Sequence, residues 1–314
     1  MLVLDAEAIR ARCRMRDLID ALRVSFGGAC TLPPRQMCSI PGGAGARLLL
    51  AMPAFDADGS GAVKLVTFLP DNATRGLPTV QGVVIVFAET GAPVALLDGT
   101  IITRLRTGAT SALASSYLSQ AKSQHLVIIG TGALAPYMAA AHCAVRPISR
   151  ISICGRDAAR AEAAARGVRA LIGERIAVVA GRIVEEVVAS ADIVSCATTS
   201  ATPVLAGAWL RPGVFVDLVG SFSPDKRECD DEVMRRSRIF VDTFAGALAE
   251  AGDLLDPLRR GIIGRERIEA ELADLVTGRV IGRRSDEEII TFKSVGAALE
   301  DLAAARLIVA GMCG

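Results

Sequence analysis

The stretch Leu126-Val-Ile-Ile-Gly130-Thr-Gly132-Ala-Leu-Ala135 is an apolar, β-branched run that ends in the pattern glycine-x-glycine-x-x-alanine. A segment that includes Ala139, Ala140 and Ala141 follows it and is typical of a helix. In a strand, turn and helix of this kind, the first glycine permits the tight turn and the second admits a pyrophosphate to the N–H groups of the helix N-terminus. The alanine lets the helix pack against the strand. The stretch therefore predicts a Rossmann-type fold that binds a nicotinamide or flavin dinucleotide.

The next strand is expected within Arg150-Ile-Ser-Ile-Cys-Gly155-Arg156-Asp157. Where an acidic side chain would bind the ribose 2′-hydroxyl of NAD, this chain has Gly155 and then Arg156. A guanidinium can form paired, charge-assisted hydrogen bonds with the 2′-phosphate of NADP. Asp157 is better suited to cap a helix over residues 158–166 that stops at Gly167. We therefore expect NADPH as the preferred cofactor and NADH as the second choice; a solvated loop arginine is the alternative interpretation of Arg156.

Composition favours a globular enzyme of two domains. The chain has 314 residues, which exceeds the usual size of one core, and its formal charge of +1 gives no electrostatic reason to expect nucleic acid or an acidic membrane as partner. The eight cysteines form no C-x-x-C pair and no His-linked metal spacing, so no metal is expected and the thiols fit a reducing compartment. Without a signal pattern or a long apolar run, the expected location is the cytoplasm.

The order of elements separates two kinds of fold. A helix is expected over residues 5–26, and a largely antiparallel sheet from four segments that follow: residues 47–52, 61–68, 80–87 and 93–98. A helix over 105–117 leads into the nucleotide-binding stretch. Strands then alternate with helices, which predicts a doubly wound parallel sheet with further strands at residues 176–179, 191–197, 213–220 and 238–242. A last helix, over 294–309, is expected to fold back on the first domain.

Four ordered motifs resemble the ornithine cyclodeaminase/μ-crystallin family: Leu105-Arg-Thr-Gly-Ala-Thr-Ser111, the Gly130 turn, Val219-Gly-Ser-Phe-Ser-Pro-Asp-Lys-Arg-Glu228 and Phe292-Lys-Ser-Val-Gly296. The resemblance covers nearly the whole chain. It implies an α/β protein with a Rossmann-type domain over residues 116–289. It further implies an α+β domain for substrate binding and dimerisation that is built from both chain ends, residues 1–115 with 290–314. A homodimer is therefore expected.

The resemblance also assigns site residues. Arg35, Lys64 and Arg106 correspond to cations around a substrate carboxylate, Thr79 to a substrate-side threonine, and Lys64 is the candidate proton donor. A surface arginine remains the alternative for Arg35, a turn residue for Thr79, and a purely binding role for Lys64. The cofactor is assigned to Thr107, Gly130, Thr131, Gly132, Ala133, Leu134, Arg156, Thr198, Val219, Gly220, Phe222, Lys293 and Ser294.

One residue departs from the cyclodeaminase pattern. Cyclodeaminases carry an acidic residue in the loop after the strand that ends at Val219-Gly220, where it engages the side-chain amine of ornithine; this chain has Phe222 there. A phenyl ring cannot pair with an ammonium as a carboxylate does, although Asp225 lies nearby in sequence. The loop resembles the branch that reduces Δ1-pyrroline-2-carboxylate to L-proline and Δ1-piperideine-2-carboxylate to L-pipecolate. The alternatives are an NAD-dependent ornithine cyclodeaminase and a non-catalytic, NADPH-dependent binding protein of the crystallin type.

Overall fold

A computed structural model of the protein describes residues 1–42 and 47–311. The chain forms two compact units, Met1–Arg106 with Ala297–Gly314 and Thr107–Gly296, which are called the first and the second unit below. Among the described residues, no helix combines the length and the apolar character needed to cross a membrane.

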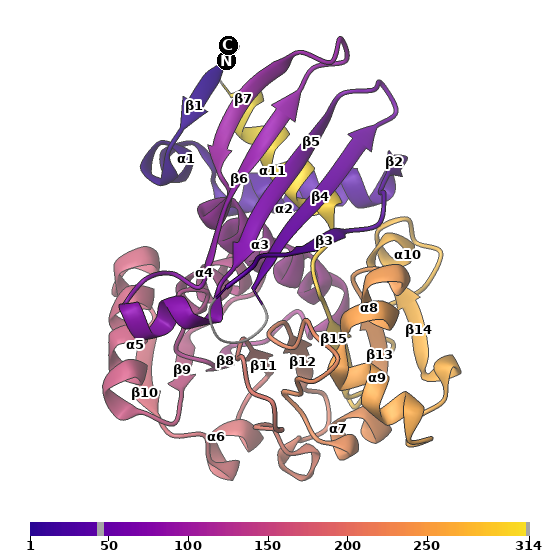
Figure 1. Cartoon of the computed structure of the whole chain (residues 1–314). Helices are drawn as coiled ribbons and strands as arrows, with labels where there is room; N and C mark the ends of the chain where they lie inside the picture. Colours follow the sequence, from indigo (N-terminus) through magenta and orange to yellow (C-terminus); the bar gives the residue numbers. More distant parts are fainter. Residues whose placement is uncertain (43–46, 312–314) are drawn as a thin grey trace. The chain divides into compact units, whose positions relative to one another are not determined.

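The first unit is built on a twisted sheet whose strands run in the order β1-β7-β6-β5-β4-β2, with β3 paired to β4 (Figure 1). All neighbours are antiparallel except β1 and β7, which are parallel. The predicted meander is therefore confirmed. The strands are β1 (Leu2–Leu4), β2 (Cys30–Thr31), β3 (Gln36–Ser39), β4 (Leu48–Asp56), β5 (Gly61–Phe68), β6 (Val80–Phe87) and β7 (Pro93–Asp98).

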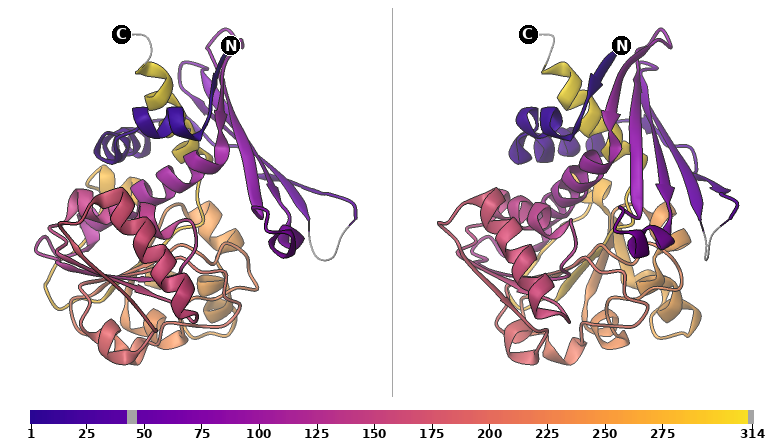
Figure 2. Two further views of the ribbon diagram at one scale, coloured as in Figure 1. Left: turned by 90° about the vertical axis from the view of Figure 1, so that its left-hand side faces the viewer. Right: turned by 60° about the vertical axis from the view of Figure 1, so that its left-hand side comes forward.

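Helices of the first unit cover one face of this sheet. Helices α2 (Met15–Gly27) and α11 (Ala298–Ala310) pack against each other, and α11 contacts β4, β5 and β6 (Figure 2). The unit also contains α1 (Ala6–Arg12), the short helix η1 (Pro70–Arg75) and the first part of α3 (Gly99–Leu118).

The predicted helix over residues 5–26 is in fact two helices, α1 and α2, separated by extended backbone at Cys13 and Arg14. In one continuous helix, Ile9 would lie about 180° around the axis from Leu18, because each residue advances by about 100°. The break lets both side chains be fully buried.

The second unit holds a parallel sheet with the strand order β10-β9-β8-β11-β12-β15-β13-β14. The order reverses between β8 and β11, which is the point where doubly wound sheets bind ligands at the carboxyl ends of their strands. The predicted Rossmann-type fold is confirmed. The strands are β8 (His125–Ile129), β9 (Arg150–Cys154), β10 (Ala177–Gly181), β11 (Ile193–Cys196), β12 (Phe215–Leu218), β13 (Arg238–Val241), β14 (Ile268–Glu271) and β15 (Ile290–Lys293).

Helices connect these strands. Helices α4 and α5 pack against each other, α4 against β8 and α5 against β9 and β10 (Figure 1). The helices are α4 (Ala135–Val145), α5 (Ala158–Ile172), α6 (Glu185–Ala189), α7 (Asp231–Arg236), α8 (Phe244–Glu250), α9 (Gly252–Arg259) and α10 (Leu272–Val276), with short helices η2 (Gly207–Trp209) and η3 (Arg265–Arg267).

Helix α5 is longer than expected. Asp157 caps it as predicted, since its Oδ1 accepts the N–H of Arg160 at 2.9 Å. The helix does not stop at Gly167, however, but at Gly173, whose φ of +82° suits glycine. Gly167 lies inside the helix, and a Cβ there would be 3.3 Å from Pro136 of α4. The glycine thus serves close helix packing and does not end the helix.

The units divide the chain at residues other than the expected domain limits of 115/116 and 289/290. Strand β15 was expected with the N-terminal domain, but its four residues are buried between β12 and β13 in the second unit. The later half of α3 also belongs to the second unit. A Cβ at Gly108 would lie 2.7 Å from the carbonyl of Tyr137, and Ser111 donates a hydrogen bond to Asp217 at 2.9 Å. Close packing on α4 and this buried hydrogen bond explain the earlier limit.

Candidate active site

A buried group of charged residues lies in the first unit. The Nζ of Lys64 on β5 is 2.7 Å from Oδ2 of Asp301 on α11. The guanidinium of Arg106 on α3 donates to Oε2 of Glu300 at 2.7 Å, and its Nε is 3.3 Å from Oδ1 of Asp301. All four residues are at most 7% exposed. We call Lys64, Arg106, Glu300 and Asp301, together with Arg35, the cation group.

Strand register explains why Lys64 points toward α11. Its partners across the sheet are Met52 and Val84, and the same row continues to Leu97 and Leu4. Directly paired residues project to the same face, and these four neighbours are buried. Lys64 is therefore the charged member of an otherwise apolar row, which is why it needs an anionic partner.

Arg35 belongs to this group. It is half-buried before β3, and its charge acts on Lys64 together with that of Arg106. The group therefore brings three cations close enough to act on one another. An anionic ligand such as a carboxylate is the kind of molecule that such cations bind.

The ammonium of Lys64 is easier to deprotonate than an ordinary lysine. Burial lowers the pKa of Lys64 to about 8; the negative charge of Asp301 opposes this shift, and the positive charges of Arg106 and Arg35 add to it. A lysine with such a pKa can give up a proton near neutral pH.

Thr79 has contacts of a different kind. It is half-buried just before β6, and its carbonyl accepts the N–H of Leu69 at 2.8 Å. In the described part of the chain, no contact joins Thr79 to the cation group. Its assignment to the substrate stays a prediction, and the structure supplies evidence for its role in the turn.

In the second unit, the Gly130 turn has the geometry that its sequence predicts. Gly130 has a φ of +137°, and a Cβ there would collide with the carbonyl of Ala197. Gly132 is exposed, and no atom lies within 4 Å of where its Cβ would be. The fold itself therefore requires glycine at 130 but not at 132, where the open space suits a close-approaching ligand such as a pyrophosphate. Thr131, Ala133 and Leu134 complete the turn before α4.

The end of β9 is crowded. Gly155 is buried, and a Cβ there would lie 2.5 Å from Cγ2 of Thr131 in the turn. Arg156 is the first exposed residue after the strand. The position nearest the turn thus has no side chain, and the next carries a solvent-accessible guanidinium.

Most of the remaining predicted cofactor residues lie at the carboxyl ends of neighbouring parallel strands. Thr198 follows β11, and Val219 and Gly220 follow β12, where Val219 donates its N–H to the carbonyl of Cys196 at 2.9 Å. Ser294 follows β15 and donates its N–H to the carbonyl of Leu218 at 3.0 Å. Thr107 is buried in α3.

Lys293 differs from the other predicted cofactor residues in the burial and the ion pairs of its side chain. Its side chain is fully buried, 3.3 Å from Oδ2 of Asp253 and 4.0 Å from Oε2 of Glu228. The two carboxylates thus hold its ammonium inside the unit. A cofactor role for Lys293 can therefore involve only its backbone, at the end of β15.

The family follows from comparison with known proteins. The model of the ornithine cyclodeaminase/mu-crystallin family matches residues 2–312. The chain belongs to this family. A Δ1-pyrroline-2-carboxylate reductase of Colwellia psychrerythraea is 36% identical over 313 residues, which are 98% of each protein. The structure of Thermococcus litoralis Δ1-pyrroline-2-carboxylate reductase in complex with NADH and L-proline has a TM-score of 0.94, 34% identity and coverage of 100% of this chain and 98% of the other. An archaeal alanine dehydrogenase dimer with bound NAD has a TM-score of 0.90 and 29% identity, covering 100% of this chain and 96% of the other.

The loop after β12 carries Phe222, the residue that was expected to distinguish this chain from a cyclodeaminase. The ring of Phe222 is half-buried, and the Nζ of Lys226 lies 4.6 Å from its centroid. Asp225 is exposed, and a hydrogen bond from Ser223 is the main cause that lowers the pKa of its carboxyl. Asp225 thus lies at the surface of its own loop.

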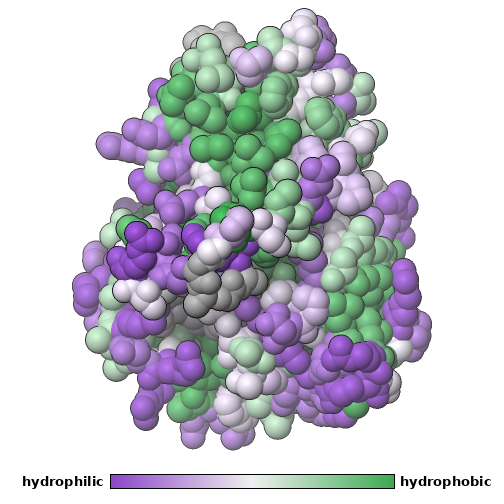
Figure 3. All heavy atoms as spheres, in the orientation of Figure 1, coloured by the Kyte–Doolittle hydropathy of each residue, from purple (hydrophilic) through white to green (hydrophobic). Residues whose placement is uncertain are grey.

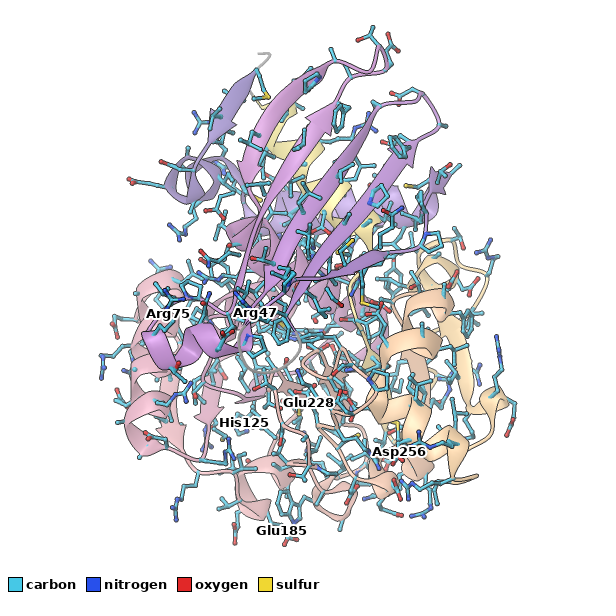
Figure 4. All side chains as sticks on the ribbon, in the orientation of Figure 1. Arg47, Arg75, His125, Glu185, Glu228 and Asp256 are labelled. Carbon is cyan, nitrogen blue, oxygen red and sulfur yellow. The ribbon has the colours of Figure 1, made fainter. Side chains whose placement is uncertain are left out.

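The two histidines have structural contacts. His125, at the start of β8 (labelled in Figure 4), contacts the carbonyl of Ser190 at 3.0 Å and the hydroxyl of Ser152 at 2.9 Å. His142 is fully buried and lies 3.4 Å from Oδ2 of Asp217.

Sequence reasoning did not single out Glu300, Asp301 or Glu228 for a site role. The signal for the first two was present: adjacent acids in the helix Ala298–Ala310, whose other residues except Arg306 are apolar, need cationic partners if they are buried. Glu228 is the last residue of the motif that begins at Val219, but no local pattern showed that its carboxylate points into the unit.

Proposed function

We propose that this protein reduces cyclic imino acids with a reduced nicotinamide dinucleotide, converting Δ1-pyrroline-2-carboxylate to L-proline and Δ1-piperideine-2-carboxylate to L-pipecolate. The observation that carries the proposal is the buried cation group, in which Lys64 has a pKa of about 8. Such a group can bind an α-carboxylate and supply a proton. The similarity to reductases of Δ1-pyrroline-2-carboxylate supports the same reaction.

The chemistry assigns a role to each cation. Arg106 and Arg35 bind the substrate carboxylate, because guanidinium groups can donate paired hydrogen bonds to its two oxygens. The Lys64 ammonium donates its proton to the ring nitrogen while the imine carbon accepts a hydride, so the C=N bond becomes an amine. The bound dinucleotide supplies that hydride. Glu300 and Asp301 hold Arg106 and Lys64 in place before substrate arrives.

Phe222 argues against the cyclodeaminase alternative. Ornithine would bring a second ammonium into the site, and a buried ammonium without an anionic partner is costly. At the position where cyclodeaminases carry the acid, this chain presents an aromatic ring, and Asp225, which follows in the same loop, is exposed.

The proposal predicts a clear pattern in a parallel assay. The purified protein should oxidise NADPH or NADH with pyrroline-2-carboxylate and piperideine-2-carboxylate, and it should release no ammonia from L-ornithine. Absorbance at the nicotinamide band and an ammonia assay measure the two reactions. Comparable rates of ammonia release from ornithine and of imine reduction would contradict the proposal, and binding of the dinucleotide without any turnover would favour the crystallin-type alternative.

We further propose that NADPH is preferred and that Arg156 binds its 2′-phosphate. Arg156 is exposed at the end of β9, and the acid that follows it, Asp157, is engaged as the cap of α5. Arg156→Ala should weaken NADPH by about 1.5–3 kcal/mol and leave NADH nearly unchanged. Fluorescence titration gives both affinities.

A matched control uses the turn that both cofactors share. Gly132→Ala adds a methyl group where the protein leaves open space, so the fold should persist while both dinucleotides weaken alike. If Arg156→Ala also weakens both equally, Arg156 does not recognise the 2′-phosphate.

A homodimer formed through the first unit is also proposed. On the sheet face opposite to Lys64, cross-strand partners form a second apolar row: Pro53, Val63, Ile85, Leu96 and Val3. Val3 is 65% exposed, and Figure 3 shows a hydrophobic area over this sheet. An apolar sheet face of this kind suits a second copy of the chain.

Ile85→Glu should therefore convert the dimer to a monomer, because a charge at the centre of an apolar interface would be buried without a partner. Sedimentation equilibrium measures the mass. Val179→Glu, which changes an exposed apolar residue on β10 of the second unit, is the control and should leave the mass unchanged. A monomeric unmodified protein would refute the proposal.

A further inference from the structure

The carboxylate of Glu228 joins two loops of the second unit. Its Oε1 accepts the N–H of Thr198 at 2.6 Å, and its Oε2 accepts those of Gly220 at 2.6 Å and Ser221 at 3.3 Å. Figure 4 labels Glu228 near these loops, at the ends of β11 and β12. One side chain thus satisfies backbone donors from two strand ends.

These loops carry predicted cofactor residues. Thr198 follows β11 and Gly220 follows β12, at the carboxyl edge where doubly wound sheets bind their ligands. They also approach each other closely, since a Cβ at Gly220 would collide with the backbone of Thr198 and lie 2.5 Å from Oε1 of Glu228. The backbone on both sides of the carboxylate is therefore closely fitted to it.

Glu228 is itself held from two sides. The Nζ of Lys293 on β15 lies 4.0 Å from its Oε2 and 3.3 Å from Oδ2 of Asp253 on α9. Oδ1 of Asp253 accepts the N–H of Glu228 at 2.8 Å and that of Cys229 at 3.2 Å. Glu228, Asp253 and Lys293 are all fully buried. Removing such carboxylates from water is costly, and the lysine offsets part of that cost.

We propose that Glu228 is a positioning residue for dinucleotide binding: with Lys293 and Asp253 behind it, its carboxylate fixes the Thr198 and Gly220 loops in the geometry that the cofactor requires. This inference rests on the proposed function. Glu228 acts through the backbone that it holds and does not itself contact the cofactor. The charged form is essential, because only a carboxylate presents lone pairs alone to three N–H donors.

Protonation of Glu228 should therefore weaken dinucleotide binding. Burial raises the pKa of Glu228 to about 7, with Asp253 adding to the shift and Lys293 and the N–H donors of Thr198 and Gly220 opposing it. In the described part of the chain, Cys196 on β11 and Cys229 also lie near this cluster, and burial raises the pKa of both thiols, so they stay neutral near pH 7. Two further charged groups act on these thiols: Asp217 on Cys196 and Arg227 on Cys229. Below about pH 7, an O–H would face the backbone donors.

The test measures NADH affinity by fluorescence in the full-length protein without substrate. Glu228→Gln replaces one acceptor by an NH₂ group, and Glu228→Asp keeps the charge but shortens its reach. Both should raise the Kd of NADH about tenfold or more. Glu288→Gln is the matched control, because Glu288 also accepts two backbone N–H groups, from Arg284 at 2.8 Å and Ser285 at 3.3 Å, and pairs with Arg238. It precedes β15, at the opposite end of the strand, and should leave the Kd unchanged.

The unmodified protein provides an independent readout. Its Kd for NADH should rise about tenfold as the pH falls from about 8 to about 6, since the competent fraction then falls to about a tenth. NADH is the probe because it lacks a 2′-phosphate that would titrate as well. A folded Glu228→Asp or Glu228→Gln protein with unchanged NADH affinity, or a Kd independent of pH in the unmodified protein, would overturn the inference. Failure of the unmodified protein to bind NADH would instead contradict the proposed function.

Discussion

Lys64→Met should reduce kcat for imine reduction about 10²–10⁴-fold, the usual contribution of a positioned acid, while NADH affinity stays unchanged. Methionine has a similar length and an apolar character that suits the row in which Lys64 lies. The variant therefore removes the proton and the charge with little loss of packing. Steady-state kinetics and a fluorescence titration separate the two effects. Lys122→Met is the control, because Lys122 is an exposed lysine paired with Asp286.

The same variant should change the pH profile. Lys64 donates its proton only when charged, so with a pKa of about 8 the rate of imine reduction should fall as pH rises through about 8. Proline oxidation, which needs the neutral amine, should rise over the same range. In Lys64→Met, the residual activity should no longer show this fall in the rate of imine reduction above about pH 8. If the fall persists in the variant, the proton comes from the imine in solution and Lys64 only binds substrate.

Arg106→Ala should have the second large effect, on stability as well as on activity. Arg106 lies between the buried Glu300 and Asp301, and removing one partner of a buried ion pair costs about 3–5 kcal/mol. The remaining carboxylates would also repel the carboxylate of the substrate. Urea unfolding should show the loss of stability, and turnover should fall below detection or the KM for the imino acid should rise steeply.

A control distinguishes the two consequences of that change. Arg238 also pairs with two carboxylates, Glu269 at 2.6 Å and Glu288 at 3.1 Å, but it lies in the second unit outside the predicted site. Arg238→Ala should lower stability without changing the KM for the imino acid. A folded Arg106→Ala protein with an unchanged KM would show that Arg106 is structural and does not bind substrate.

Local patterns were sufficient for much of the fold. The strands over residues 61–68, 80–87 and 93–98 begin and end where the sequence predicts, because β-formers alternate or cluster there between glycine, proline and Asx turns. The Gly130 turn was equally readable, since the positive φ of Gly130 is a local property of the backbone.

Tertiary packing decided what the sequence did not show. The break at Cys13 depends on burying both Ile9 and Leu18, and Gly167 stays helical because a neighbouring helix packs against it. Strand β15 lies far along the chain from its partners β12 and β13, so its place in the sheet follows from long-range pairing.

In the site, too, local motifs identified some residues, and long-range contacts determined the others. The motifs pointed to Lys64 and Arg106, yet their partners Glu300 and Asp301 lie almost two hundred positions later than Arg106 in the chain. A pattern read along the sequence cannot show which buried acid neutralises which base. For Lys293, the motif predicted a cofactor residue, but the inward direction of its side chain depends on Asp253 and Glu228 and could not be seen in the motif.

The crowding between Gly155 and Thr131 limits how this enzyme's coenzyme use could be redesigned. The usual route to an NAD-specific variant places an acid at the end of the second strand, but any side chain at residue 155 would push into the glycine-rich turn. An engineer would have to change residue 131 at the same time, and so disturb the turn itself. The exposed residue 156 is the accessible position, and selection for a different coenzyme should therefore yield substitutions of Arg156 first.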